Sequence, residues 1–184
     1  MPHQTIDVIA HEALGADDLQ QLSDLFDAEY LDEHGPWDPS QPYCYAPHDV
    51  HVIARDTGRT VGHVGWARRE IDVGGTPVVI AGVGGVLVAR NARGADLGIR
   101  MLHAAERAMR TAGGIHFGYL GCREAVVPFY EAGGWKRIAV AERSVGRDGI
   151  TVSDPPGQPL LILPIESDIS DWPSGTVDLR GRAW

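Results

Sequence analysis

The sequence predicts a single α/β domain in which a mixed sheet is covered by helices. Three observations support this class. Short β-branched runs separated by turn residues fill residues 51–88, two helical patterns follow at 97–112 and 125–132, and apolar strand-like runs alternate with these helices. The 184 residues suffice for one domain, spanning 1–184, and 43% of them are hydrophobic, the ordinary content of a globular protein.

The first half of the chain predicts one helix, one loop and a β-meander. Leucines and a phenylalanine at three- and four-residue spacings predict an amphipathic helix over residues 16–30. Four prolines in residues 31–47 predict a long surface loop. The runs 51–55, 62–68 and 76–83 are bounded by turn residues and predict antiparallel strands.

The second half predicts strands and helices in alternation. The expected elements are, in order, a strand continuing to Val88, a helix over 97–112, a strand over 115–121, a short helix over 125–132, a strand over 135–142, a polar connection over 147–159 and a final apolar strand over 160–165. This alternation is typical of a sheet with helices packed on its faces.

Charge and cysteine content exclude several functional classes. The net charge of −9 argues against nucleic acid, because backbone phosphates are bound by clustered Lys and Arg. The chain begins without a basic and then apolar leader, and no run approaches the roughly 18 apolar residues of a spanning helix. We therefore expect a cytoplasmic protein with no membrane partner. Cys44 and Cys122 lie far apart in sequence, so we expect neither a disulfide framework nor a cysteine-based metal site, and we assign no metal ligand.

Residues 84–98 predict an anion-binding loop. A strand, a short loop containing Arg93 and Gly94, and the start of a helix follow one another there. Backbone N–H groups and the helix dipole favour an anion at such a junction, and Arg93 would add a charge-assisted contact. Other phosphate-binding motifs are absent from the sequence, since it contains no GxxxxGK[ST] and no GxGxxG at this strand.

This loop, followed by a strand and then by PFYEAGGW at residues 128–135, resembles the GNAT family of N-acetyltransferases. The resemblance implies a mixed, mostly antiparallel sheet that is splayed between its fourth and fifth strands and flanked by helices. Acetyl-CoA would lie in the gap. Main-chain groups of Val86, Leu87 and Val88 would bind pantetheine. The pyrophosphate would be wrapped by a longer set: Arg93, Gly94, Ala95, Asp96, Leu97, Gly98 and Ile99. Asp96 departs from the family pattern, which has glycine there, so we expect its side chain to face solvent or to cap the helix.

The resemblance also implies how the transfer reaction is catalysed. A backbone N–H near Val86 would polarise the thioester carbonyl, and Tyr130 would act as general acid for the departing thiolate. Gly84 stands where relatives carry a catalytic glutamate. The candidates for the base therefore remain open: Glu29, Asp32, Glu33, His34, Glu124, a C-terminal carboxylate or a water chain. His63 and His116 lie in apolar runs, and we interpret them as core residues.

The C-terminal segment LLILPIESDISDWPSGTVDLRGRAW resembles that of the aminoglycoside 2'-N-acetyltransferases. This implies that residues 166–184 close over the acceptor, and that the acceptor is bound by Glu29, by Asp32 or Glu33, by Asp154 and by Trp184. Arg123 replaces a small hydroxyl residue of these relatives, and it would favour an acceptor bearing a carboxylate, such as kasugamycin, over gentamicin- or kanamycin-like polycations.

The expected activity is therefore acetylation of an amine on an aminoglycoside-type antibiotic, which would confer resistance. Two alternatives remain. One is a GNAT enzyme acting on a peptide, a lysine or a metabolite amine, and the other is a non-catalytic module that binds acetyl-CoA. By analogy with GNAT relatives the chain is a possible homodimer.

Overall fold

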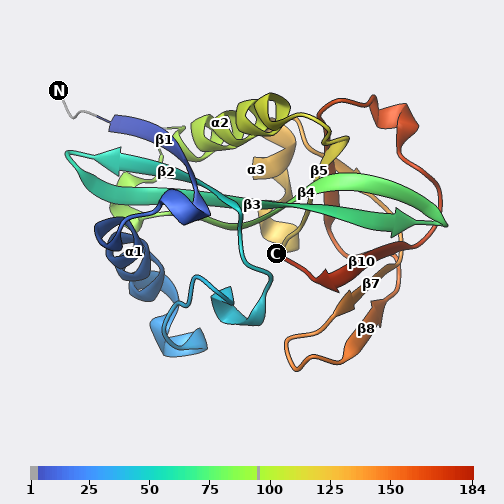
Figure 1. Ribbon diagram of the computed structural model, residues 1–184, viewed down its shortest axis with the longest axis horizontal. Coiled ribbons are helices and arrows are strands. Elements are labelled where there is room, and N and C mark those ends of the chain that lie inside the picture. The colour runs from blue at the N-terminus through green and yellow to red at the C-terminus, as the bar shows by residue number, and fades with distance from the viewer. Residues whose placement is uncertain (1–3, 95) are drawn as a thin grey trace.

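The computed structural model describes residues 4–94 and 96–184. Within them the chain forms one sheet of ten strands and three α-helices (Figure 1). The strands are β1 (Gln4–Ala10), β2 (Val50–Asp56), β3 (Arg59–Val73), β4 (Thr76–Val88), β5 (Phe117–Gly121), β6 (Lys136–Ile138), β7 (Glu142–Val145), β8 (Thr151–Asp154), β9 (Leu160–Pro164) and β10 (Val177–Arg182). The helices are α1 (Ala16–His34), α2 (Leu97–Ala112) and α3 (Val127–Ala132). No helix in these residues is both long and apolar enough to cross a membrane.

The strands follow the order β6-β9-β5-β4-β3-β10-β7-β8, with β2 between β3 and β1. The long strand β3 therefore pairs with β2 along its first half and with β10 at its last two residues. The pairs β4–β5 and β7–β10 are parallel, and the others are antiparallel. This mixed, mostly antiparallel sheet is the one that the sequence predicts.

Alternation along β2 sends its side chains to two different helices. Val52 and Ala54 belong to the hydrophobic cluster under α2, whereas Ile53 belongs to the cluster that contains Leu22 and Phe26 of α1. Successive side chains of a strand point to opposite faces of the sheet, so α1 and α2 cover opposite faces (Figure 1). The predicted helices over 16–30 and 97–112 are confirmed, and α1 runs four residues further, to His34.

Strands β4 and β5 part after a short parallel ladder. They pair only from Ile80 with Phe117 to Gly82 with Tyr119, although β4 continues to Val88 and β5 to Gly121. Beyond Gly82 the two strands no longer exchange ladder hydrogen bonds. The splay predicted between the fourth and fifth strands is therefore confirmed.

A β-bulge sits in β4 at the point where it leaves β5. His63 of β3 faces Leu87 and Gly65 faces Gly84, so two residues of β4 oppose one residue of β3. Gly85 within the bulge has a φ of 58°, a left-handed conformation that glycine adopts without steric cost. The bulge reverses the alternation along β4: Val83 packs in the α2 cluster, whereas Leu87, four residues on, packs in the α1 cluster.

The tail after β9 is part of the sheet, which differs from the expectation that β9 is the last strand. Val177 and Leu179 of β10 are fully buried, and Arg69 holds the strand by donating to the carbonyl oxygens of Leu179 at 3.1 Å and Arg182 at 2.7 Å. At its end, the Trp184 ring packs on Gly82, where a Cβ atom would lie 2.1 Å from the ring. The C-terminus therefore lies near the centre of the molecule (Figure 1).

Three other sequence predictions are corrected in detail, and one strand is added. The strand predicted over 135–142 is two short strands, β6 and β7, because they pair with different neighbours: β6 lies beside β9, whereas β7 lies beside β10. Strand β8 lies inside the predicted connection 147–159 and pairs with β7. The N-terminal strand β1, which the sequence analysis does not predict, pairs with β2. The loop predicted over 31–47 begins as helix, and its Trp37 is buried against Phe26, with ring centroids 5.1 Å apart.

Because β10 completes the core, shortening Leu179 should destabilise the protein. Leu179→Ala removes a fully buried side chain, and we expect it to lower the free energy of unfolding by about 2–5 kcal/mol. Ile169→Ala is the matched control, since it removes the same number of carbon atoms from the same tail but at a side chain that is 45% exposed. Urea unfolding measures both variants. Equal, small effects would mean that the tail does not contribute to the core.

Candidate functional site

A cavity of about 1130 Å³ occupies the gap between β4 and β5. It starts at residues 92–94 and 96–99, in the loop before α2 and the first turn of that helix, passes residues 83–88 of β4 and the end of β5, and reaches the β7–β8 hairpin and Trp184. Pockets for one small ligand usually measure about 300–1,000 Å³. The volume of this cavity lies just above that range, so it can hold a large ligand.

The α2 end of the cavity has the features of an anion site. Asp96 is the N-cap residue of α2, but its side chain caps none of the helix amides, so these N–H groups remain available to a ligand. Gly94 has a φ of 94° with open space where a Cβ would be, whereas a Cβ on Gly98 would lie 2.9 Å from Phe129. Leu97 and Ile99 also line this end. Ala95, predicted to belong to the same loop, lies outside the described residues.

Asp96 shows why glycine suits this position. Its φ is 52° and its ψ is 14°, a left-handed conformation that costs most residues roughly 1–2 kcal/mol and that aspartate tolerates better than most. The side chain is exposed. Of the two expected positions for Asp96, capping or facing solvent, the structure has the second.

Two arginines and one glutamate border the same end. Arg93 donates through Nε to the Val88 carbonyl at 2.9 Å and through Nη2 to Glu29 at 3.2 Å. Arg90 donates through Nε to the other carboxylate oxygen of Glu29 at 3.0 Å. The hydrogen bond from Arg90 is the main cause of the lowered pKa of Glu29. Glu29, predicted to bind the acceptor, thus lies beside the anion loop, where its charge holds the two arginines.

Gly84 faces Trp184 at the centre of the cavity. A Cβ on Gly84 would lie 2.5 Å from the main-chain carbonyl carbon of Trp184 and 3.2 Å from His48 Nε2. A glutamate therefore does not fit where GNAT relatives carry their catalytic acid, because the end of the chain fills that space. Val86, Leu87 and Val88 line the wall next to Gly84, in the segment of β4 that has lost β5 as a partner.

Tyr130 reaches the cavity from α3. It is 8% exposed, and burial raises its pKa, so its hydroxyl stays protonated at neutral pH and can donate a proton. The ring also packs edge-on against Trp135, with centroids 6.1 Å apart. The catalytic position and the packing role considered for this residue are therefore compatible.

Tyr119 and Glu142 form a buried pair that sequence analysis does not single out. The Tyr119 hydroxyl donates to Glu142 Oε2, and both residues line the cavity. Tyr119 is the last residue of β5 that pairs with β4, so the carboxylate lies close to the point where the strands part. Asp154, a predicted acceptor ligand, faces Glu142 across the β7–β8 ladder and also lines the cavity.

The environment of Glu142 raises its pKa. The cause is first its burial, and Asp154 adds a like charge, while the hydrogen bond from Tyr119 acts in the opposite direction. Burial and the Glu142 charge likewise raise the pKa of Tyr119. A carboxylate with a raised pKa is a stronger base than an ordinary one, so Glu142 is the best-placed base in the cavity.

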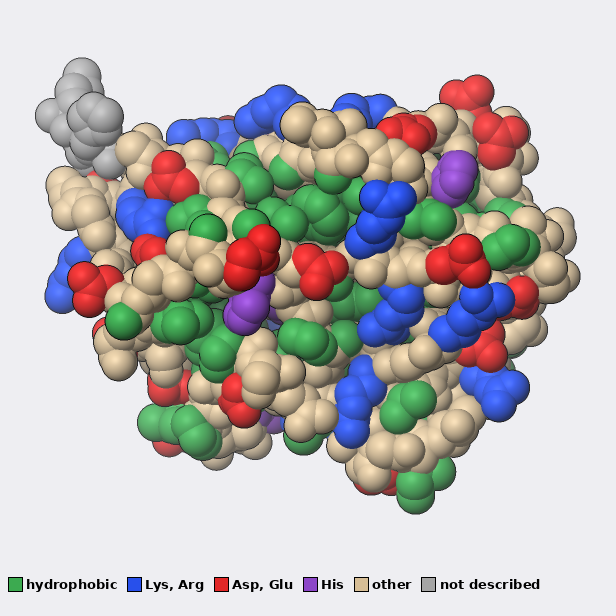
Figure 2. Space-filling model, viewed as in Figure 1, with side chains coloured by type: hydrophobic (Ala, Val, Ile, Leu, Met, Phe, Trp, Pro, Cys, Tyr) green, Lys and Arg blue, Asp and Glu red, His purple; other side chains and the backbone are tan. Residues whose placement is uncertain are grey.

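Basic side chains border the acceptor end. Arg123 and Arg147 both line the cavity, and Arg147 donates through Nε to the Tyr43 carbonyl at 3.0 Å. Figure 2 shows that Lys and Arg side chains gather over β7, β8 and β10, where Arg143 and Arg182 lie. The site therefore combines carboxylates with guanidinium groups, despite the net charge of −9.

Two predicted ligands lie away from this cavity. Asp32 and Glu33 are exposed near the end of α1 and do not line it; His34 lines it instead. The geometry thus joins Gly84, Val86, Arg93, Tyr130, Arg123, Asp154 and Trp184 around one space, and adds Tyr119 and Glu142. The only sequence signal for Glu142 is a single acid at the end of an apolar run.

Comparison with known proteins agrees with this architecture. The family model of Nodulation protein A (NodA) matches residues 7–182. A Nodulation protein A of Mesorhizobium plurifarium is 28% identical over 157 residues, which cover 80% of this chain and 79% of the relative. The identity is therefore spread along most of both chains.

Solved structures share the fold at low identity. The GNAT family N-acetyltransferase YhbS of Escherichia coli, in complex with CoA, has a TM-score of 0.64 and 15% identity, and the match covers 97% of this chain and 91% of that one. An aminoglycoside 6'-N-acetyltransferase complexed with coenzyme A has a TM-score of 0.60 and 18% identity, covering 88% and 98%. These likenesses establish the fold, which is the GNAT fold that the motifs predict.

We predict that Glu142 ionises above the ordinary glutamate value of 4.5. Carbon-13 NMR of the carboxyl groups should give its midpoint, and Tyr119→Phe should raise it further, because the hydrogen bond that favours the ionised form is lost. The unfolded chain releases this proton more readily, so the wild type should lose stability relative to Glu142→Gln as the pH rises from 4.5 to that midpoint. A midpoint at or below 4.5 would contradict this assignment.

Proposed function

Because the chain belongs to the Nodulation protein A (NodA) family, a GNAT-like acyltransferase family, we propose that it is an acetyl-CoA-dependent N-acetyltransferase for an amino group on a small molecule. The observation that carries this proposal is the cavity. It joins an anion site at the start of α2 to a buried carboxylate at Glu142 through the gap between β4 and β5.

The residues present suit acetyl-CoA. The uncapped amides of α2 and the guanidinium of Arg93 suit a pyrophosphate. Main-chain groups of residues 83–88 no longer pair with β5 and can pair with the amides of the pantetheine arm. Three solved structures that share this fold contain CoA or acetyl-CoA, which supports the same donor here.

The side chains divide the chemistry of transfer between them. Acetyl-CoA supplies the activated acyl group as a thioester. Glu142 takes the proton from the acceptor ammonium, so that a neutral amine attacks the carbonyl carbon and forms the new C–N bond. A β4 amide near Val86 polarises the carbonyl oxygen. When the C–S bond breaks, Tyr130 donates a proton to the departing thiolate, and the second proton lost by the attacking nitrogen returns to Tyr130, so that the products are the amide and the free thiol. Glu142 thus takes the role that Gly84 leaves vacant.

The lining of the acceptor end favours an amine that also carries an acidic group. Glu142 and Asp154 can each pair with an ammonium group, and burial of such a group requires a partner. Arg123 and Arg147 would repel a molecule with many ammonium groups but attract a carboxylate. An aminoglycoside-type amino sugar with few amines and a carboxyl group, as in kasugamycin, fits these contacts.

An acceptor panel tests the proposed function. The full chain is mixed with acetyl-CoA, and thiol release is followed with kasugamycin, gentamicin, glucosamine and a lysine peptide as acceptors. We expect turnover of the amino sugars, with kasugamycin preferred over gentamicin. Turnover of the peptide alone would refute the acceptor class, and no thiol release with any amine would refute the proposed activity.

Two conservative substitutions, each of which changes one functional group, test the catalytic roles. Glu142→Gln and Tyr130→Phe should each lower kcat by about 10²–10⁴-fold and leave the affinity for CoA unchanged. Glu131→Gln, an exposed residue of α3 beside Tyr130, is the control and should retain wild-type kcat. A Glu142→Gln enzyme that keeps its kcat and only raises the acceptor KM would make Glu142 a binding residue rather than the base.

A further inference from the structure

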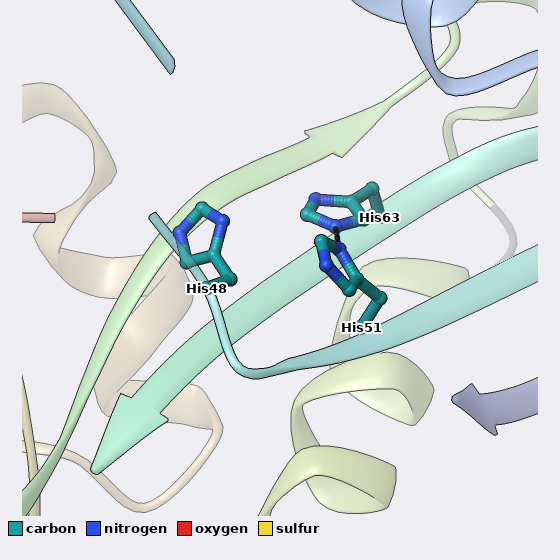
Figure 3. Close-up of side chains that lie close together, drawn as sticks. All are labelled: His48, His51 and His63. Atoms are coloured by element: carbon teal, nitrogen blue, oxygen red, sulfur yellow. Dashed lines mark hydrogen bonds between the residues drawn. The ribbon is translucent and has the colours of Figure 1, made fainter. Parts of the chain in front are cut away.

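Three buried histidines meet behind the wall that β4 gives to the cavity. His48 precedes β2, His51 lies in β2 and His63 lies in β3, and they are 5%, 1% and 0% exposed. One ring nitrogen of each lies within 4.8 Å of the other two. Figure 3 shows the three rings around a common space, with His51 and His63 joined by a hydrogen bond.

Hydrogen bonds fix the orientation of two of these rings. His63 Nδ1 lies 2.7 Å from the Gly85 carbonyl oxygen, which can only accept, so Nδ1 carries the proton and Nε2 has a free lone pair. His63 Nε2 lies 2.8 Å from His51 Nδ1 and accepts its proton in a hydrogen bond. The other ring nitrogen of His51, Nε2, lies 3.0 Å from His11 Nδ1. A ring held through its outer nitrogen by a carbonyl is the usual arrangement of a metal-binding histidine.

The third ring is not satisfied by the protein. His48 Nε2 is buried and has no hydrogen-bond partner among the described residues, an arrangement that costs stability unless another ligand compensates. The ring lies tightly against glycine backbone, since a Cβ on Gly65 would be 2.4 Å from His48 Cγ. The fold therefore encloses a histidine nitrogen that is free to bind a ligand from outside the protein.

All three imidazoles are neutral at neutral pH, the form that binds metal. Burial lowers the pKa of His51 to about 3 and that of His63 to about 4, and it lowers the pKa of His48 well below its ordinary value.

We propose that His48, His51 and His63 form a site for one divalent transition-metal ion, with Zn²⁺ as its representative. Imidazole nitrogens suit zinc and its neighbours rather than Mg²⁺ or Ca²⁺, which take oxygen ligands. In a tetrahedral zinc site with bonds of about 2.0–2.1 Å, ligand nitrogens lie roughly 3.4 Å apart. The nitrogens here need shifts of about an ångström or less each, which small side-chain rotations supply.

Binding requires one rearrangement of protons. His51 moves its proton from Nδ1 to Nε2 and then donates to His11 Nδ1. The proton of His11 moves from Nδ1 to Nε2 of the same ring, which is partly exposed. No net proton is lost. His63 keeps its hydrogen bond to Gly85, so the ion is linked through one side chain to the β4 bulge.

The ion would hold three segments together at the bulge. It would join the chain before β2 to β2 and β3, and through Gly85 it would stiffen the strand that lines the cavity at Val86. The histidines themselves do not line the cavity. The site is therefore structural, and it does not rest on the proposed acetyltransferase activity.

Metal titration of the full chain tests the proposal. The protein is made without a histidine tag, treated with a chelator and titrated with Co²⁺, with visible ligand-field absorption as readout, and then with Zn²⁺ in competition. We expect one equivalent to bind with a tetrahedral spectrum. Thermal unfolding should shift upward by about 5–10 °C at a 100-fold excess of free Zn²⁺ over its dissociation constant. Absence of stoichiometric binding would overturn the site.

Variants locate the ion. His48→Gln and His51→Gln should weaken Zn²⁺ binding by at least about 100-fold, whereas His103→Gln and His116→Gln should leave it unchanged. Both control histidines are exposed and lie outside the cluster, and for His116 this corrects its interpretation as a core residue. Nitrogen-15 NMR of the histidine rings gives the same information in the wild-type protein if a variant does not fold. Zn²⁺ should shift the ring nitrogens of His48, His51 and His63, and a shift confined to other histidines would refute the proposal.

Discussion

The parting of β4 from β5 is the constraint on which the rest of this structure depends. A buried backbone N–H or carbonyl group must find a partner, and residues of β4 beyond Gly82 have none in β5. The sheet thus leaves a row of peptide groups facing a cavity of about 1130 Å³. Helix α2, the β7–β8 hairpin and the C-terminal residues then enclose the space that these groups open.

The end of the chain is held at this gap by Arg69 of β3 and by Arg182 at the end of β10. Arg69 lies with its guanidinium carbon 3.9 Å from the centroid of the Trp184 ring, and Arg182 donates to the carbonyl oxygens of Cys44 at 2.7 Å and Arg147 at 3.1 Å. These bonds join the tail, the loop before β2 and the β7–β8 turn into one wall. The wall encloses the acceptor end and includes strands β7, β8 and β10 of the sheet itself.

The sequence predicts those parts of the fold and site that depend on local patterns. The helix over 97–112 and the anion loop are predicted because helical periodicity and the Arg93-Gly94 pair are local signals. Strand β10 is missed because only Val177 and Leu179 alternate within a polar tail. Glu142 is missed because its importance comes from Tyr119, 23 residues away in the chain. The exposure of Asp32 and Glu33 likewise depends on how α1 packs against the sheet, which is a property of the tertiary structure.

The bulge at Gly85 acts as a phase shift within a single strand. Before it, odd-numbered residues of β4 such as Val83 belong to the α2 layer; after it, the odd-numbered Leu87 belongs to the α1 layer. In a regular strand, residues of one parity would face the same layer along its whole length. Because of the one extra residue at the bulge, the odd-numbered residues of β4 face the α2 layer before Gly85 and the α1 layer after it. An insertion or deletion of one residue here would exchange the two layers for every position that follows in β4, so the length of this segment is as tightly constrained as its composition.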